Sequence, residues 1–250
     1  MYTLVLVRHG QSLWNQENRF TGWVDIDLTQ QGIIEAALSG RSLKKEGFEF
    51  DIAFTSYLKR AIRTLFVILD EMDQMWIPVQ KSWRLNERHY GALTGLRKDE
   101  MAQQYGDEQV RLWRRSYDVC PESIDMDDPR YPGKDRRYAT LPQDMIPKSE
   151  CLKDNVARVI PYWEDEIAPA ILAGKQAIVV SHGNTLRSLI KHIVGMSDEE
   201  IIEFNVPTGI PLIVKLDKNL KVTSYDYLGD PEAIKNAIDT VKNQGKSGKV

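Results

Sequence analysis

The chain has 250 residues, of which 42% are hydrophobic and 28% are charged, and its formal net charge is −3 at pH 7. A chain of this length and apolar content can bury a substantial core, so we expect residues 1–250 to form a single domain. The charge is nearly balanced and no apolar run could span a bilayer, so we expect neither a nucleic-acid nor a membrane partner.

The N-terminal part of the chain alternates between strand and helix patterns. Aliphatic and β-branched runs predict buried strands, whereas apolar residues at helical spacing predict amphipathic helices. Thr29 is a suitable N-cap for the first helix and Gly47 is a suitable stop. A polar and aromatic loop over 11–27 precedes this helix. The elements predicted here are strands over 4–7, 51–55 and 76–79 and helices over 29–46 and 58–72.

The C-terminal part continues this alternation and ends in an antiparallel pair. Ser149 is the expected cap of a long helix that Pro161 should bend, and Ser197 with Glu200 forms a capping-box pattern. Gly195 should close the helix that precedes this capping box. The elements predicted here are helices over 107–116, 149–167 and 184–195, a short helix starting at 197, a final helix starting at 230, a strand over 177–180, and a hairpin over 210–216 and 220–227.

Between residues 118 and 147 the periodicity disappears, and the segment contains five prolines. A stretch this long without a pattern is usually a functional loop, so we expect an irregular insertion that acts as a lid or contact surface. The polar residues 243–250 are expected to form a mobile tail. The whole pattern predicts an α/β fold of three layers, with a mainly parallel sheet, one antiparallel edge strand and helices on both faces.

The two cysteines and the N-terminus bear on the cellular compartment. Cys120 and Cys151 form no C-x-x-C pair, so we interpret them as free thiols in a reducing environment. Met1 leads directly into a predicted strand rather than into a signal peptide. We therefore expect a cytoplasmic protein.

Two of the predicted strands end in the same way. The run over 4–7 reaches Arg8-His9-Gly10, and the run over 177–180 reaches Ser181-His182-Gly183. Parallel strands of one sheet bring their carboxyl ends to the same edge, where ligands of open sheets bind. If the two strands are neighbours, both imidazoles and Arg8 meet in one cleft, an arrangement suited to a phosphoryl group. A lone histidine at a strand end is usually structural, but two in the same setting favour chemistry.

A neutral imidazole is a competent nucleophile toward phosphorus at physiological pH. Arg8 could supply a bidentate fork for the phosphoryl oxygens, and Asn184 at a helix start offers a second anion site. Arg60 follows another strand end, but a surface arginine on a helix is equally consistent with solvation. Glu87 could exchange the proton of a substrate hydroxyl, although an ordinary loop ion pair with Arg88 is at least as consistent with the pattern.

Several blocks of the chain together resemble the cofactor-dependent phosphoglycerate mutases of the histidine phosphatase superfamily. Arg8-His9-Gly10 alone would indicate only the superfamily, whereas the longer blocks are more specific. The resemblance runs from the first strand to residue 246 and includes the irregular segment. The blocks that carry it are Arg8-His9-Gly10 with Ser12 and Asn15, Arg19-Phe20-Thr21-Gly22-Trp23, Leu58-Lys59-Arg60-Ala61, Asn86-Glu87-Arg88-His89-Tyr90-Gly91-Ala92-Leu93, Trp113-Arg114-Arg115, His182-Gly183-Asn184 and Pro207-Thr208-Gly209.

This resemblance implies an isomerase that interconverts 3-phosphoglycerate and 2-phosphoglycerate in glycolysis and gluconeogenesis. His9 would carry the phosphoryl group, Glu87 would give and take the proton, and His182 would hold the phosphoryl group in transfer. The resemblance further implies priming by 2,3-bisphosphoglycerate, no metal, small phosphoglycerates as the partners, and a homodimer or homotetramer. The substrate-binding residues it implies are Arg8, Gly10, Gln11, Ser12, Asn15, Thr21, Gly22, Arg60, Arg88, His89, Tyr90, Lys98, Arg114, Arg115, Gly183 and Asn184.

Two positions discriminate within this family. Related bisphosphoglycerate synthases carry Gly where Ser12 stands and Cys-Ser where Thr21-Gly22 stands, so this chain resembles the mutases at both. Gln11 departs from the usual Glu, which removes one negative charge near a phosphate. Two rival interpretations are a general phosphomonoesterase of the same fold and a catalytically silent module that binds phospholigands.

Overall fold

A computed structural model describes residues 1–244 of the protein, and six strands of this part form one sheet in the order β3-β2-β4-β1-β5-β6. The strands β1 to β4 run parallel to one another, β5 is antiparallel to β1, and β6 is antiparallel to β5. The sheet confirms the predicted α/β class, and its antiparallel part is a two-stranded hairpin. The strands are β1 (Tyr2–Arg8), β2 (Ile52–Thr55), β3 (Val79–Lys81), β4 (Ala177–Ser181), β5 (Leu212–Leu216) and β6 (Val222–Tyr227).

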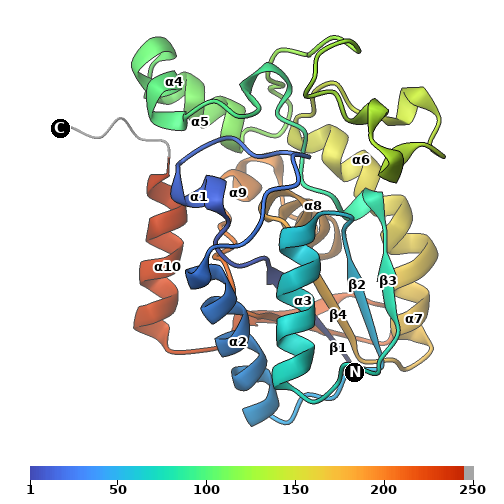
Figure 1. Cartoon of the computed structure of the whole chain (residues 1–250). Coiled ribbons are helices and arrows are strands. Elements are labelled where there is room, and N and C mark those ends of the chain that lie inside the picture. Colours follow the sequence, from blue (N-terminus) through green and yellow to red (C-terminus); the bar gives the residue numbers. More distant parts are fainter. Residues whose placement is uncertain (245–250) are drawn as a thin grey trace.

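Helices pack on both faces of this sheet (Figure 1). Helices α2 and α3 cover one face, whereas α6, α7 and α8 cover the other. Helices α4 and α5 lie beyond the carboxyl ends of the parallel strands. The helices are α1 (Leu13–Gln16), α2 (Gln30–Lys45), α3 (Lys59–Glu71), α4 (Lys98–Tyr105), α5 (Asp107–Arg115), α6 (Leu152–Tyr162), α7 (Ala168–Leu172), α8 (Gly183–Val194), α9 (Asp198–Glu203) and α10 (Pro231–Asn243).

The side-chain alternation of β1 explains why its sequence is uniformly aliphatic. Leu4 and Leu6 belong to the core under α6 and α8, whereas Val5 and Val7 belong to the core under α2 and α3. All four side chains are fully buried. A central parallel strand is covered on both faces, so it shows a continuous apolar run rather than a polar–apolar alternation.

Four details of the predicted elements are corrected. Residues 76–78 are not a strand: β3 begins at Val79, and Trp76 is exposed. The N-cap of α6 is Cys151 rather than Ser149, whose hydroxyl donates instead to the carbonyl of Pro121 at 2.7 Å. Helix α4 was not predicted. The long helix continues past Pro161 through a π-helical turn over Trp163–Ile167 into α7.

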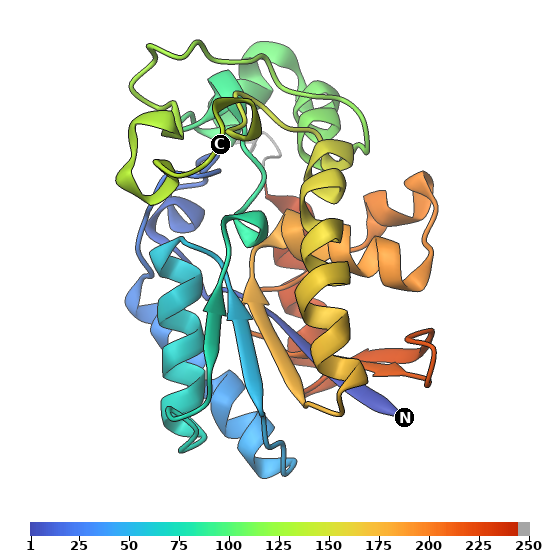
Figure 2. The ribbon, with the colours of Figure 1, turned by 90° about the vertical axis from the view of Figure 1, so that its right-hand side faces the viewer.

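The segment 118–147 contains no α-helix or strand, and all of it lies within the described part of the chain. It holds three short 3-10 turns and packs around Trp23 with its own apolar cluster, which includes Ile124 and Tyr138. The hydroxyl of Tyr138 accepts a hydrogen bond from the side chain of Asn86 at 2.8 Å. Figure 2 shows this segment above the carboxyl ends of the strands. It is therefore held against the rest of the protein by specific contacts.

The last helix, α10, ends at Asn243. It begins after Asp230, whose side chain caps it by accepting from the N–H groups of Glu232 and Ala233. The predicted mobile tail over 243–250 therefore starts inside this helix, and its residues 245–250 lie outside the described part. None of the helices within residues 1–244 is both long enough and apolar enough to pass through a bilayer.

Candidate active site

The two histidines predicted to meet do so at the ends of neighbouring strands. Strands β1 and β4 pair in parallel with Arg8 opposite Ser181, so His9 and His182 follow at the same level. The centroids of their rings are 5.0 Å apart with an interplanar angle of 61°. Both side chains are buried. The register of the sheet thus creates a pair of imidazoles at its carboxyl edge, as the sequence predicted.

Hydrogen bonds give the His9 ring one tautomer, in which Nε2 is the nitrogen that carries the lone pair. Its Nδ1 lies 2.7 Å from the carbonyl oxygen of Gly10, and because a carbonyl only accepts, Nδ1 carries the proton. Its Nε2 then presents a lone pair, toward which Nε of Arg60 points at 3.3 Å. Burial lowers the pKa of His9 well below its usual value, and the charges of Arg60 and Arg8 lower it further. The ring is therefore neutral and nucleophilic at physiological pH.

The His182 ring is positioned by Ser56, a residue that the sequence analysis did not single out. The hydroxyl oxygen of Ser56 accepts from the N–H of Leu58 at 3.1 Å and lies 2.8 Å from Nε2 of His182, to which its O–H donates in the tautomer that carries the ring proton on Nδ1. The Nδ1 atom is buried and has no hydrogen-bond partner within residues 1–244. Burial, followed by the charge of Arg60, lowers the pKa of His182 well below its usual value. A buried ring nitrogen without a partner is suited to a ligand oxygen.

Two buried arginines flank this pair. Arg60 donates from Nη1 to the carbonyl of Val24 and from Nη2 to that of Gly22, each at 2.8 Å, while burial lowers its pKa to about 10. Arg8 donates from Nη1 to the carbonyl of Val206, and its buried Nε has no partner among the described residues. The structure therefore places Arg60 in the site and not on a solvated helix face.

Glu87 lies beside the histidines and is held by the backbone. One carboxylate oxygen accepts from the N–H of Arg88 at 2.8 Å and from the N–H of Asn184 at 3.2 Å. The guanidinium of Arg88 donates elsewhere, to the carbonyls of Glu150, Trp113 and Arg114. The alternative of a Glu87–Arg88 loop ion pair is therefore wrong, and Glu87 is oriented into the site.

His9, Arg8, Arg60 and Glu87 line a cavity of about 650 Å³, including its open mouth, whereas the predicted catalytic residue His182 is not among its described lining residues. Seven cationic side chains line it, whereas Glu87 is the single carboxylate among the described lining residues. Such a balance suits a ligand with several negative charges. The lining residues are Arg8, His9, Asn15, Arg19, Phe20, Thr21, Gly22, Arg60, Glu87, Tyr90, Lys98, Arg114, Arg115, Gly183, Asn184, Arg187, Val206, Val241 and Gln244.

Burial lowers the pKa values of three further cations of the cavity, Lys98, Arg114 and Arg115, which we call the distal cations. It lowers the pKa of Lys98, an effect that the charge of Arg114 reinforces. It lowers the pKa values of Arg114 and Arg115 to about 10 each. Arg115 donates to the carbonyls of Ile202 and Phe204, which fixes its position. An anion that enters would offset a cluster of like charges that the protein has already desolvated.

Five of the predicted binding residues lie outside this lining and support it instead. A Cβ at Gly10 would lie 2.1 Å from the carbonyl oxygen of Gly32, so only glycine fits there. Ser12 caps α1 and is fully buried. The side chain of Gln11 accepts from the hydroxyl of Thr29 at 2.9 Å. The remaining two are Arg88 and His89.

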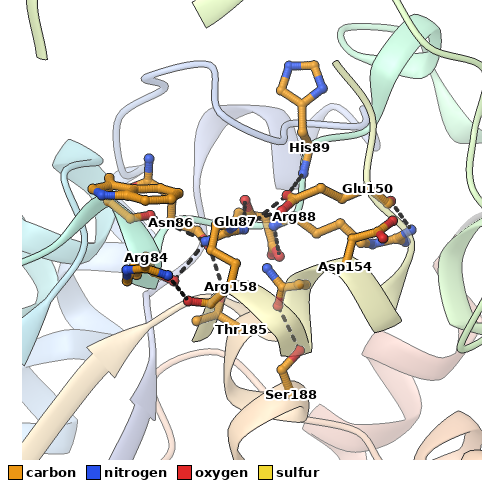
Figure 3. A network of polar contacts seen from close by, with 12 residues as sticks. Arg84, Asn86, Glu87, Arg88, His89, Glu150, Asp154, Arg158, Thr185 and Ser188 are labelled. Atoms are coloured by element: carbon orange, nitrogen blue, oxygen red, sulfur yellow. Dashed lines mark hydrogen bonds and ion pairs between the residues drawn. The ribbon is translucent and has the colours of Figure 1, made fainter. Parts of the chain in front are cut away.

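A buried ion pair behind the cavity holds the loop that carries Glu87 (Figure 3). Arg158 on α6 pairs with Glu150, with Nε 2.7 Å from Oε1, and also donates to the carbonyls of Asn86 and Glu87. Glu150 in turn accepts from the N–H of His89 at 2.7 Å. No short-range pattern indicates this network, because its contacts to the loop join residues more than sixty positions apart along the chain.

Two cavity arginines were absent from the predicted site. Arg187 is buried, and its Nη1 donates to the side chain of Asn184 at 3.0 Å, three residues earlier on α8. That spacing puts Arg187 on the same helix face as Asn184, which is the signal that could have revealed it. Arg19 lies within a block that carried the family resemblance, but it was not assigned a role.

Comparison with known proteins agrees with this geometry. The sequence profile of the histidine phosphatase superfamily (branch 1) matches residues 4–130 and 121–222. The chain belongs to the histidine phosphatase superfamily. Its members carry out phosphatase and phosphotransferase chemistry, for which the buried imidazole pair, the arginines and the single carboxylate are suited.

Solved structures share the fold of this superfamily member. A mycobacterial glucosyl-3-phosphoglycerate phosphatase is 18% identical with a TM-score of 0.68, and the match covers 91% of this chain and 97% of that one. A putative alpha-ribazole-5'-P phosphatase from Escherichia coli is 23% identical with a TM-score of 0.64, covering 92% and 96%. A protein from Thermus thermophilus is 24% identical with a TM-score of 0.57, covering 91% and 99%.

Proposed function

We propose that the protein is a phosphoglycerate mutase that uses a phosphohistidine and is primed by 2,3-bisphosphoglycerate. The observation that carries this proposal is the cavity itself: seven cations surround one nucleophilic imidazole and one carboxylate. A phosphoglycerate bears a carboxylate besides its phosphate, and a bisphosphoglycerate bears a second phosphate. The distal cations Lys98, Arg114 and Arg115 supply partners for these additional anionic groups.

The mechanism follows from the tautomer and the neighbours of His9. A bond forms between Nε2 of His9 and a phosphorus of 2,3-bisphosphoglycerate while the P–O bond to the glycerate oxygen breaks. Glu87 delivers a proton to that oxygen, and a monophosphoglycerate remains in the cavity. Arg8, Arg60 and the unpartnered Nδ1 of His182 receive the phosphoryl oxygens as charge redistributes.

The mutase cycle reverses this step on the bound monophosphoglycerate. Glu87 takes the proton of the free hydroxyl, the hydroxyl oxygen attacks phosphorus, and the bond to Nε2 of His9 breaks. The bisphosphoglycerate then turns and returns its other phosphate, so the isomer is left. Water must be excluded from the phosphoenzyme, since hydrolysis would turn a mutase into a phosphatase.

The contacts of the cavity point to the end of α10 as one part of that cover. Val241 and Gln244 line the cavity, and Nη2 of Arg114 lies 3.5 Å from the carbonyl of Val241. No residue of segment 118–147, the expected lid, is among the described lining residues. We therefore assign this segment the role of supporting the loop around Glu87 through the Tyr138–Asn86 contact.

A general phosphomonoesterase is the second candidate, because solved structures that share the fold include proteins named as phosphatases. The two activities separate in one assay of 3-phosphoglycerate in the presence of a metal chelator, with and without 2,3-bisphosphoglycerate. The mutase interpretation predicts 2-phosphoglycerate formation that the primer stimulates, with little release of phosphate. Fast phosphate release from varied monoesters without stimulation by the primer would contradict it.

The matched variants for this assay are His9→Ala and His192→Ala. We expect His9→Ala to abolish turnover, because the phosphoryl carrier is lost. His192 is exposed near the end of α8 and does not line the cavity, so its replacement leaves turnover unchanged. Full activity of His9→Ala would refute the assigned role.

A further inference from the structure

Three potential metal ligands gather outside the catalytic cavity. They are the thiols of Cys120 and Cys151 and the carboxylate of Asp154, and one ligand atom from each lies within 4.8 Å of the other two. Sγ of Cys120 lies 3.2 Å and Sγ of Cys151 lies 3.0 Å from the same oxygen, Oδ2 of Asp154. None of these residues lines the catalytic cavity.

The separation of these atoms is close to that of ligands around a tetrahedral ion. Zinc binds thiolate sulfur at about 2.3 Å and carboxylate oxygen at about 2.0–2.2 Å, so two such ligands lie roughly 3.5–3.8 Å apart. The two S···O distances are shorter than this by a few tenths of an ångström. Small side-chain rotations therefore suffice to make room for an ion between the three groups.

The protein positions these ligands by secondary structure. Cys151 is the N-cap of α6 and Asp154 lies at its third position, where the carboxylate also accepts from the N–H of Cys151 at 2.9 Å. Cys120 lies near the start of segment 118–147, whereas Cys151 follows its end. The N–H of Lys153 donates to the carbonyl of Tyr117 at 2.8 Å, so the residues before and after the segment lie side by side. The cluster thus joins parts of the chain that are 31 residues apart.

We propose that Cys120, Cys151 and Asp154 form a binding site for one divalent cation of borderline softness, of which zinc is the type. Two thiolates with a carboxylate favour such an ion over magnesium or calcium, which prefer oxygen alone. Cys120 and Asp154 are exposed, so the fourth position is open to water. Binding forms two metal–sulfur bonds and releases two protons to solvent, with no change of oxidation state.

The expected effect of the ion is to hold the start of segment 118–147, at Cys120, against the start of α6. Glu150, adjacent to Cys151, accepts from the N–H of His89 and pairs with Arg158, so the cluster lies beside the network behind the cavity. Figure 3 shows Asp154 near Glu150 in that network. The site is structural and takes no part in the phosphoryl transfer, so catalysis needs no metal there.

Cobalt(II) is the most direct probe, because a thiolate ligand gives a charge-transfer absorption in the near ultraviolet that histidine and carboxylate ligands do not give. The chain has two cysteines, so any such band arises from Cys120 or Cys151, and the stoichiometry then tells whether one chain supplies the site. We expect titration of the reduced full-length chain, free of any affinity tag, to give the band with one equivalent of cobalt. Zinc should then abolish the band by displacing cobalt.

The variants Cys120→Ser and Asp154→Asn test the ligand set while the wild-type chain is the control. Cys120→Ser changes an exposed side chain and should leave the basal activity unchanged, while the affinity for cobalt falls by more than about tenfold. Asp154→Asn keeps an acceptor for the cap of α6 and should weaken binding by a similar factor.

Four results would overturn the proposal. One is the absence of a thiolate–cobalt band at one equivalent. A second is a stoichiometry of two chains per ion, which would mean that exposed Cys120 bridges molecules. A third is thiols that react with a thiol reagent equally fast with zinc and with chelator. The fourth is a chain lighter by two hydrogen atoms that has lost both thiols, because the cysteines would then form a disulfide pair instead.

Discussion

Two contacts of the ring, together with its burial, account for the reactivity assigned to His9. The carbonyl of Gly10 fixes the proton on Nδ1, Nε of Arg60 approaches Nε2, and burial with two nearby arginines keeps the ring neutral. A neutral ring attacks phosphorus, and once phosphorylated it presents charge that the same arginines stabilise. The nucleophile and its electrostatic support thus come from the same few side chains.

At this scale we expect Arg60→Met to lower turnover by about 10²–10³, the usual effect of removing one donor to a developing anion. The side chain also holds the carbonyls of Gly22 and Val24, so thermal unfolding is measured alongside. Single-turnover kinetics of phosphoenzyme formation is the primary readout. The matched control is Arg63→Met, because Arg63 lies on the same helix, is 59% exposed and pairs with Asp27. Equal activity of the two variants would contradict the role of Arg60.

The sequence predicted most of the site residues that lie at the ends of strands and missed the network that acts across the fold. His9, Arg60 and His182 could be placed because the ends of parallel strands share one edge. Ser56 directly follows β2 and Arg187 lies three residues after Asn184 on α8, so both positions carried a local signal, whereas the contacts of Arg158 and Glu150 to the loop carried none. The resemblance implied Gly10 as a binding residue, and in the structure its constraint is close contact with Gly32.

At the scale of elements, the loop around Glu87 depends on α6. The Arg158–Glu150 pair is buried, with side chains 6% and 5% exposed, and it donates to the carbonyls of the loop. A buried ion pair that loses one partner leaves an uncompensated charge. The position of the Glu87 carboxylate therefore depends on the packing of α6, which carries Arg158.

We expect Arg158→Met to lower the free energy of unfolding by about 3–5 kcal/mol. Urea denaturation followed by fluorescence measures this change. The control is Arg111→Met, which breaks an exposed pair with Glu203 and should cost about 0–1 kcal/mol. A loss for Arg158→Met no larger than for the control would show that the buried pair does not hold the loop.

Local chemistry explains which elements could be predicted. Helices α2, α9 and α10 begin at Thr29, Ser197 and Asp230, whose side chains accept from the first turn, and such caps can be read from short motifs. Helix α4 was missed because its cap, Arg97, makes no side-chain cap bond. Cys151 is outside the usual set of caps, so the start of α6 was assigned to Ser149.

At the scale of the whole molecule, three of the four histidines are buried, with pKa values below the ordinary value. Burial lowers the pKa of His89 to about 4, from 6.5. As pH falls below 6.5 the unfolded chain takes up a proton that the folded chain does not, so stability is lost in that direction. The protein should therefore be most stable above pH 6.5 with respect to these groups.

We expect each buried histidine to remove roughly 1.4 kcal/mol of unfolding free energy per pH unit between about pH 6.5 and its folded pKa. Denaturation at pH 7.5, 6.5 and 5.5 measures the slope. His89→Gln should reduce the slope by about one proton, whereas His192→Gln, at an exposed position, should leave it unchanged. An unaltered slope in His89→Gln would contradict the burial of a neutral His89.

The implied homodimer or homotetramer stays a prediction, which light scattering would check.

The position of the phosphate on the phosphoenzyme tests the central claim most directly. The protein would be incubated with 2,3-bisphosphoglycerate, digested under alkaline conditions that preserve phosphohistidine, and analysed by mass spectrometry and phosphorus NMR. The tautomer of His9 predicts one phosphate per chain, on Nε2 of His9. Phosphate on Nδ1 of His9, on His182 or on any other residue would contradict the account, as would a chain that takes up none.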